Sequence, residues 1–247
     1  FACRIGGTNC NCKDIKMTIR IAKFLSNASI ASRREAERMI ASGHVSVNGE
    51  IIDSPATFIN DSDVVCVDGK IVSVNSEIGL YMFHKPINIM TTRSDPNGRK
   101  TIYDCLDSKY HHLKYIGRLD YKTTGLLLLT NDGELARKLT LPSSNIPRTY
   151  IATTNGNMKN LSLARHGVTV DGIKYRPMQI SVLNDKQISV TTTEGKKNEI
   201  RIVLRFCGAP VSQLHRVSFG NIKLGDLPVG KIVKIPKKTI DEILKNF

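Results

Sequence analysis

By residue type and position, Asp120 is the side chain best placed to do chemistry. It follows the apolar residues Tyr115, Ile116 and Leu119 and opens a polar loop, residues 121–125, before another apolar run. A carboxylate between two buried segments is held by rigid elements, as a catalytic group must be. Composition alone favours the simpler alternative that Asp120 caps a turn. Its assignment therefore depends on the motif around it.

That motif is G-R-L-D-x-x-T-x-G-L-L-L-L-T-N-D-G-E-L. It is similar to the signature of pseudouridine synthases of the RsuA/RluB family. Further segments resemble motifs of that family in the same order. They are His84–Pro86 with residues 91–104, Arg148–Tyr150, Glu194–Arg201 and Val211–Gly220. One departure is that Ile202 and Val203 follow Arg201, where the family usually has a second basic residue.

The resemblance implies the isomerisation of uridine to pseudouridine in RNA. The bond between base and ribose breaks, the uracil turns, and C5 joins C1′. Asp120 is implied to act at C1′, by adding to the sugar, by stabilising positive charge there, or by removing the 2′ proton. Arg201 is implied to pair with Asp120 and keep it ionised. Nothing is oxidised and no second molecule is consumed, so we expect no cofactor and no metal.

The resemblance also implies a pocket for a base that has left its stack. Tyr150 would stack on the uracil and help to remove the C5 proton, and Leu214 would pack against it. Arg118 would occupy the vacated space or hold a phosphate. From the residues alone, Tyr150 and Leu214 equally suit the core of a sheet.

Charge points to the same class of partner. The net charge is +14 and the sequence pI is about 9.6. Such a charge favours nucleic acid over an anionic membrane as the partner. The alternative is that the basic surface only keeps the protein soluble. Residues 79–247 carry 27 basic against 13 acidic side chains, whereas residues 17–78 carry six against eight. The candidate phosphate contacts in the basic portion are Lys85, Arg93, Arg99 and Lys100.

Residues 17–77 predict a small two-helix module. A helix from Thr18 has an apolar stripe, Ser32 and Glu35 form a capping box for a second helix that stops at Gly43, and hairpin turns follow at 48–49 and 68–69. Residues 19–59 resemble the alpha-L RNA-binding domain. The basic residues on its helices are the candidate RNA contacts: Arg20, Lys23, Arg33, Arg34 and Arg38.

We expect residues 1–16 to be a disordered tail and residues 78–247 to form the catalytic domain. Its apolar runs predict strands at 80–83, 126–130, 148–153, 188–193, 200–204 and 232–235, and helices at 103–106, 132–139, 162–166 and 240–246. The fold class is therefore α+β, a small alpha-L domain followed by a pseudouridine synthase domain on a mixed, largely antiparallel sheet.

The six cysteines contain no C-x-x-C pair, which favours free thiols over a zinc site. The longest aliphatic run, Leu126–Leu129, is too short to span a bilayer. We expect a soluble, cytoplasmic monomer.

The expected partner is ribosomal RNA or a pre-ribosomal particle. The loop T-R-S-D-P-N-G-R-K-T-I-Y-D is more similar to the large-subunit branch of the family, which favours a uridine in 23S RNA. The alternatives are a 16S substrate, or a non-catalytic ribosome-assembly protein that kept the fold. DNA binding is disfavoured, because the sequence has no recognition-helix or zinc-finger pattern.

Overall fold

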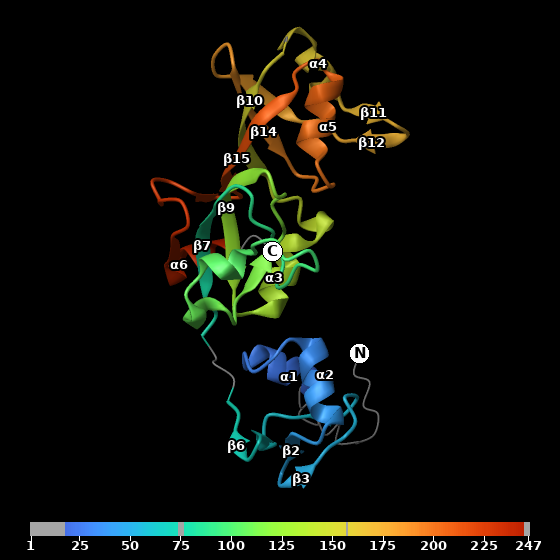
Figure 1. Cartoon of the computed structure of the whole chain (residues 1–247), viewed down its shortest axis with the longest axis vertical. Helices are drawn as coiled ribbons and strands as arrows, with labels where there is room; N and C mark the ends of the chain where they lie inside the picture. Colours follow the sequence, from blue (N-terminus) through green and yellow to red (C-terminus); the bar gives the residue numbers. More distant parts are fainter. Residues whose placement is uncertain (1–17, 74–76, 157, 245–247) are drawn as a thin grey trace, which may run out of the picture. The chain divides into compact units, whose positions relative to one another are not determined.

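A computed structural model describes residues 18–73, 77–156 and 158–244 of the chain. The chain divides between Ser76 and Glu77 into two units, which are described separately (Figure 1). The expected tail, residues 1–16, lies outside the described residues, and the domain boundaries proposed from the sequence stay predictions. None of the helices in these ranges has the length and hydropathy that a membrane span requires.

The first unit contains two helices and a four-stranded antiparallel sheet in the order β3-β2-β5-β6. Its elements are β1 (Ile19–Arg20), α1 (Ile21–Asn27), α2 (Arg33–Ala41), β2 (Val45–Val47), β3 (Glu50–Ile51), β4 (Phe58–Ile59), β5 (Val65–Val67) and β6 (Lys70–Ile71). The first helix begins at Ile21 rather than Thr18, because residues 19–20 pair with β4.

Local signals place the other elements of this unit. The Ser32 hydroxyl accepts a hydrogen bond from the Glu35 amide (3.2 Å), which caps α2 as expected. Asn48 and Gly49 have positive φ values of 52° and 89°, the geometry of the tight hairpin between β2 and β3. The helices and sheet enclose a core that includes Ile21, Leu25 and Ile40, all of them 0% exposed.

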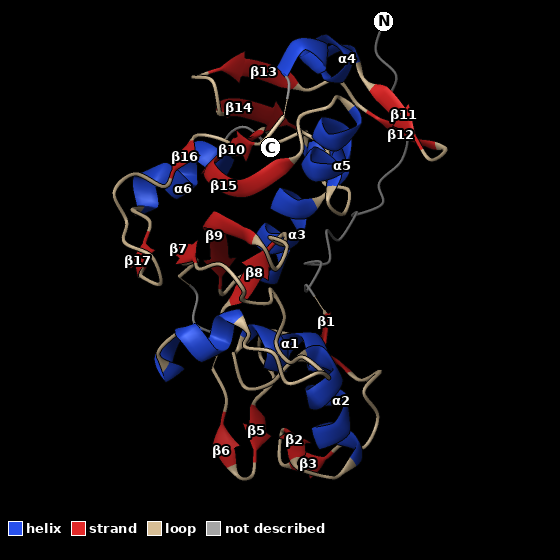
Figure 2. Cartoon of the chain, turned by 45° about the horizontal axis from the view of Figure 1, so that its top comes forward, coloured by secondary structure: helices blue, strands red, loops and turns tan. Residues whose placement is uncertain are grey.

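The second unit is built on one nine-stranded sheet (Figure 2). Its strands run in the order β13-β14-β10-β15-β9-β7-β17, with β16 beside β15 and β8 beside β9. The bounds are β7 (Leu80–Lys85), β8 (Lys114–Ile116), β9 (Thr123–Thr130), β10 (Arg148–Thr154), β13 (Gln179–Val182), β14 (Gln187–Thr192), β15 (Val211–Phe219), β16 (Ile222–Lys223) and β17 (Ile232–Lys234). A separate hairpin joins β11 (Val168–Val170) to β12 (Ile173–Tyr175).

Both faces of the central strand β9 are covered. Leu126 and Leu128 pack with α3 (Gly133–Thr140) and α6 (Lys237–Leu244), while Leu127 and Leu129 face a second apolar cluster. Burial on both faces explains the continuous apolar run, because alternation is needed only where one face meets water. The neighbours β9 and β15 are parallel, whereas the other neighbouring strands of this sheet are antiparallel, so the mixed, largely antiparallel α+β fold is confirmed.

One predicted element is wrong. Residues 200–204 belong to a helix, α5 (Glu199–Phe206), and not to a strand. The apolar run by itself suggests β structure, but Ile200, Val203, Leu204 and Cys207 are the buried positions, which is helical spacing. This face packs with α4 (Leu161–His166) against β10, β14 and β15. Strand β9 also begins at Thr123, so the polar loop after Asp120 is shorter than expected.

Candidate active site

Asp120 lies in the turn between β8 and β9, and backbone contacts fix that turn. The Thr123 amide donates to the Asp120 carbonyl oxygen (2.9 Å), and the Asn88 amide donates to that of Tyr121 (2.8 Å). The Thr91 hydroxyl donates to the Leu119 carbonyl oxygen (2.8 Å). The carboxylate is therefore carried by a turn with little freedom, as expected for a catalytic group.

The burial of Lys85 contradicts its predicted role as a surface contact to RNA. Its side chain is 0% exposed and donates to the carbonyl oxygens of Pro86 and Thr123 (both 3.0 Å), and it lies 3.4 Å from that of Asp120. Burial lowers the pKa of Lys85 to about 8, although the negative charge of Asp120 acts in the opposite direction. The cause is the register of β7, which directs Lys85 into the protein behind the Asp120 turn.

Asp120 lines two pockets, a larger one of about 790 Å³ and a smaller one of about 460 Å³. The residues that line both are Arg118, Leu119, Asp120, Lys197 and Asn198. The structure thus brings the predicted site residues together around Asp120. Arg118 accompanies it in both pockets, Arg201 lines the larger pocket, and Tyr150 and Leu214 line the smaller one.

The expected ion pair between Arg201 and Asp120 is not formed within the described residues. The guanidinium of Arg201 instead donates to the carbonyl oxygens of Val211 and Lys122 (both 2.9 Å), which occupy two of its nitrogens. Burial lowers the pKa of Arg201, and the charge of Asp120 offsets part of that change. Arg201 therefore holds the turn through Lys122 while its positive charge acts on Asp120 from nearby.

The smaller pocket contains a buried arginine that sequence reasoning missed. Arg216, on β15, is 1% exposed, and its Nε donates to the carbonyl oxygen of Leu126 (2.6 Å). Its guanidinium carbon lies 6.0 Å from the ring centre of Tyr150, which is half-buried on β10. In the sequence the L-H-R segment stands out only as part of a motif, and its third residue carries no signal of burial.

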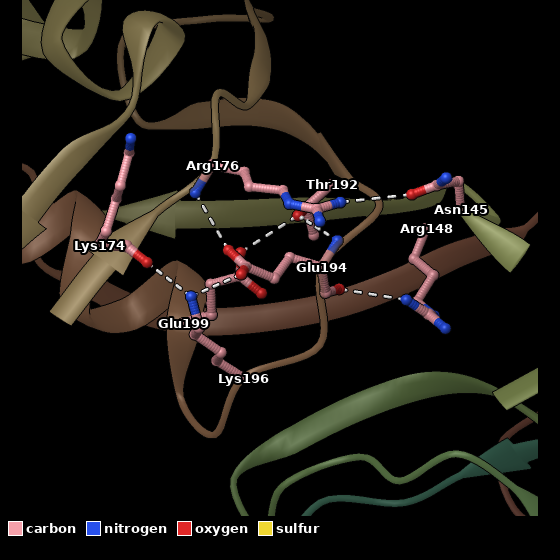
Figure 3. A network of polar contacts seen from close by, with 8 residues as sticks. All are labelled: Asn145, Arg148, Lys174, Arg176, Thr192, Glu194, Lys196 and Glu199. Carbon is pink, nitrogen blue, oxygen red and sulfur yellow. Dashed lines mark hydrogen bonds and ion pairs between the residues drawn. The ribbon is translucent and has the colours of Figure 1, made fainter. Parts of the chain in front are cut away.

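A second missed feature is a carboxyl pair in the same pocket, formed by Glu194 and Glu199 (Figure 3). Glu199 is 4% exposed and accepts a hydrogen bond from the Thr192 hydroxyl (3.2 Å). Burial raises the pKa of Glu199 to about 7, and the charge of Glu194 adds to the rise. The pKa of Glu194 is lowered: burial opposes the shift, but hydrogen bonds from Lys196 and from the Arg176 amide outweigh it.

This pair connects several elements around the pocket. Glu194 accepts from the Arg176 amide (3.0 Å), and its carbonyl oxygen accepts from Arg148 on β10 (3.1 Å). Glu199 is the first residue of α5, the helix that carries Arg201. The loop between β14 and α5 is thereby fixed at both ends, and it lines both pockets through Lys197 and Asn198.

The other candidate phosphate contacts of this unit differ in how far protein groups already engage their side chains. Arg93 donates to the carbonyl oxygens of His111 (2.7 Å) and Leu113 (3.1 Å), so its guanidinium is engaged in holding a loop. Arg99 pairs with Asp95 through two hydrogen bonds, which lower the pKa of Asp95 to about 2. Arg99 still lines the larger pocket. Lys100 is exposed.

The candidate contacts of the first unit lie mostly at its surface. Arg20, Arg33, Arg34 and Arg38 are exposed and Lys23 is half-buried. Arg20 lies over the Phe58 ring, and Arg38 pairs with Glu35 one helical turn away. Arg33 and Arg34 follow the capped start of α2 directly.

We find no candidate metal site in the part of the chain that the structure describes. Within it, no group of three or more histidine, cysteine, aspartate or glutamate side chains is arranged to hold an ion. Cys66, Cys105 and Cys207 are free thiols, and Cys3, Cys10 and Cys12 lie outside the described residues.

Comparison with known proteins identifies the family that this chain matches. Residues 79–206 match the RNA pseudouridylate synthase family, and residues 19–65 match the S4 domain. An uncharacterized RNA pseudouridine synthase of Rickettsia typhi is 38% identical over 232 residues, which cover 92% of this chain and 96% of that protein. One from Aquifex aeolicus is 35% identical, with 93% and 95% covered. A crystal structure of a pseudouridylate synthase aligns with a TM-score of 0.66 and 26% identity, over 91% of this chain and 99% of that one.

Proposed function

The chain belongs to the RNA pseudouridylate synthase family, and from that premise we propose that it isomerises one uridine of 23S ribosomal RNA, with Asp120 acting at C1′. Activity as an RNA pseudouridine synthase, an isomerase, follows from the family. The observation that supports the assignment to Asp120 is its place in the lining of both pockets, on a turn fixed by Lys85 and Arg201.

The chemistry suits a single carboxylate among cations. Cleavage of the bond between N1 and C1′ leaves positive character on the sugar, which a carboxylate stabilises by charge or by adding to C1′. Removal of the 2′ proton by the same group is the alternative route. The uracil then turns, C5 bonds to C1′, the C5 proton leaves and N1 gains a proton. The positive charges of Lys85 and Arg201 both interact with the charge of Asp120.

The two pockets suggest that one binds the base of the flipped nucleotide and the other binds the RNA backbone. The smaller pocket offers Tyr150 and Leu214 as an aromatic and an aliphatic surface for the flipped uracil. The larger pocket is basic, and the cations in its lining are Arg99, Arg118, Lys122, Lys197, Arg201 and Arg205, with Asp120 as the acid. Such a lining suits the phosphates on either side of the flipped nucleotide.

Selection of 23S over 16S RNA rests on the loop at residues 92–104. Its Arg99 lines the larger pocket and is fixed by Asp95, so the loop contributes directly to the proposed RNA surface. The first unit, an S4 domain, would bind a structured element of the same RNA through the basic start of α2.

Mapping pseudouridines in ribosomal RNA from cells with and without this protein tests the proposal. One uridine of 23S RNA should lose its modification, and purified protein should restore it on an unmodified 23S transcript. A lost site in 16S RNA would reassign the substrate. Unchanged ribosomal RNA, with no conversion of either transcript, would contradict a ribosomal substrate.

A further inference from the structure

Three buried polar atoms in the described part of the chain have no hydrogen-bond partner: Thr123 Oγ1, Arg201 Nε and Arg216 Nη2. All three residues line the pockets that contain Asp120. Folded proteins pair nearly all such atoms, because a buried donor or acceptor without a partner costs free energy. Their concentration around these pockets indicates that a bound molecule supplies the missing hydrogen-bond partners.

Arg216 is the most informative of the three. A purely structural arginine that joins β15 to β9 needs only the bond from Nε to the Leu126 carbonyl oxygen. Its guanidinium carbon lies 5.6 Å from the ring centre of Phe219 and 6.0 Å from that of Tyr150. Nη2 is left as an unused donor in a residue that is 1% exposed and lines the smaller pocket.

Thr123 supplies a second unpaired group in the same pocket. It is 2% exposed and stands three residues after Asp120. The parallel register of β9 and β15 pairs Thr123 with Leu214 and Gly125 with Arg216, which brings these side chains to one end of the two strands. Among its polar lining the pocket therefore combines an apolar surface from Leu214 and Tyr150 with two buried unpaired groups, one donor and one hydroxyl.

The proposed chemistry orients the base in this pocket. C1′ must approach Asp120, which is half-buried and lines both pockets. The ring atom opposite N1 is C4, so O4 is the base oxygen farthest from the sugar. The base atom farthest from the sugar would then meet the unpaired donor of the buried Arg216, Nη2, and the neighbouring N3–H would meet the hydroxyl of Thr123.

We propose that Arg216 determines specificity for uracil, with Nη2 donating to O4, while Thr123 Oγ1 binds the neighbouring N3 position and contributes affinity. This inference rests on the proposed function, since it places the uridine at Asp120. Cytosine carries an amino donor at position 4 and would leave Arg216 Nη2 unpaired, whereas the Thr123 hydroxyl can rotate and donate to its unprotonated N3. A site built on such hydrogen bonds discriminates strongly against the mismatched base.

Binding of twelve-nucleotide oligouridylate and oligocytidylate to the full chain tests the proposal without knowledge of the natural target. The parent is Asp120→Asn, so that bound uridine is not converted. It should prefer oligouridylate by at least about tenfold. Thr123→Val keeps the side chain's shape and breaks no protein hydrogen bond, so it should retain the melting temperature, weaken binding of both oligonucleotides and keep the preference for uracil. Arg216→Met should reduce the preference below about twofold.

Thr130→Val is the matched control on the same strand. The Thr130 hydroxyl is buried but paired, donating to the Gly79 carbonyl oxygen (2.7 Å) and accepting from the Asp132 amide (3.0 Å). Its removal should lower the melting temperature and leave the preference for uracil unchanged. A third probe, an oligonucleotide of 4-thiouridine, replaces O4 by a weaker acceptor. The parent should bind this probe less tightly than oligouridylate, whereas Arg216→Met should bind the two equally.

Two results would overturn the inference. One is a parent that binds both oligonucleotides equally. The other is a loss of affinity in Arg216→Met that is the same for uracil and cytosine, which would make Arg216 merely structural. Neither result bears on the mapping of ribosomal RNA, so failure of the proposed function and failure of this inference can be told apart.

Discussion

The ammonium group of Lys85 lies 3.4 Å from the carbonyl oxygen of Asp120 and 3.0 Å from that of Thr123. A buried cation from β7 thus holds both ends of the turn that presents the proposed catalytic carboxylate. Arg201, from α5, holds the same turn through Lys122. Two positive charges are therefore fixed behind Asp120 by backbone contacts and leave its carboxylate facing the pockets.

Lys85→Met should slow isomerisation by roughly 10- to 100-fold, because displacing a reacting group by about an ångström costs that much. The measurement is the single-turnover rate on a 23S transcript. Lys223→Met removes an exposed charge of the same unit outside the lining of both pockets and should change the rate little. Equal rates for both variants would show that Lys85 does not position Asp120.

Asp120→Asn should abolish isomerisation, since it keeps the shape of the side chain but removes the negative charge. Affinity for RNA should be largely kept, because the proposed phosphate contacts are other residues. Turnover above that of a control with RNA alone would contradict the assignment of Asp120.

Glu199→Gln should change how stability depends on pH. In the folded protein the pKa of Glu199 is raised to about 7 from an ordinary 4.5, so its contribution is full below about pH 4.5 and is lost as the pH rises through 7. Glutamine resembles the protonated form at every pH. The variant should therefore gain roughly 1–3 kcal/mol over the parent at pH 8 and little at pH 4.

Thermal or urea unfolding across pH 4–8 measures this difference, with Asp185→Asn, an exposed carboxylate of the same unit, as control. The control should follow the parent. A Glu199→Gln variant whose stability runs parallel to that of the parent over this range would show that Glu199 is not protonated in the folded state.

Gly125→Ala should destabilise the second unit through a backbone collision. Gly125 has a φ of +106°, and a β-carbon there would lie 2.3 Å from the carbonyl oxygen of Arg216. Gly225 also has a positive φ, +57°, but open space around it. Gly225→Ala should cost about 1 kcal/mol for the backbone alone, and Gly125→Ala roughly 1–3 kcal/mol more. Equal destabilisation in urea unfolding would exclude the collision.

Replacing Arg33, Arg34 and Arg38 by Ala should weaken binding to the true substrate more than binding to unrelated RNA, because the basic second unit remains. Removing one phosphate interaction should lower the slope of log K against log salt by about 0.9 for duplex RNA. Affinities over a salt series for both RNAs provide the measurement. The triple variant should still isomerise a loosely structured uridine at high enzyme concentration.

Removal of three exposed lysines of the second unit, Lys231, Lys237 and Lys238, is the matched control for charge. It should lower affinity for both RNAs alike. If the arginine variant also lowers both equally, the first unit contributes only electrostatic attraction and does not select the RNA element.

The sequence by itself determined the features that depend on neighbouring residues. The cap at Ser32, the hairpin turn at Asn48 and Gly49, and the start of α3 after Asp132 each follow from the conformational preference of a few adjacent residues. The motifs likewise identified Asp120, Tyr150 and Arg201 as parts of one site, and the structure places all three in the lining of the two pockets.

Tertiary structure alone decided which charged side chains are buried and what they contact. Lys85 and Arg216 have ordinary sequence surroundings, yet the register of β7 and the parallel pairing of β9 with β15 bury both beside the turn of Asp120. The apolar run of α5 likewise suits a strand or a helix until its packing partners are known. Burial is set by elements distant in sequence, so local pattern does not contain it, and the contacts of these two residues appear only once the sheet is assembled.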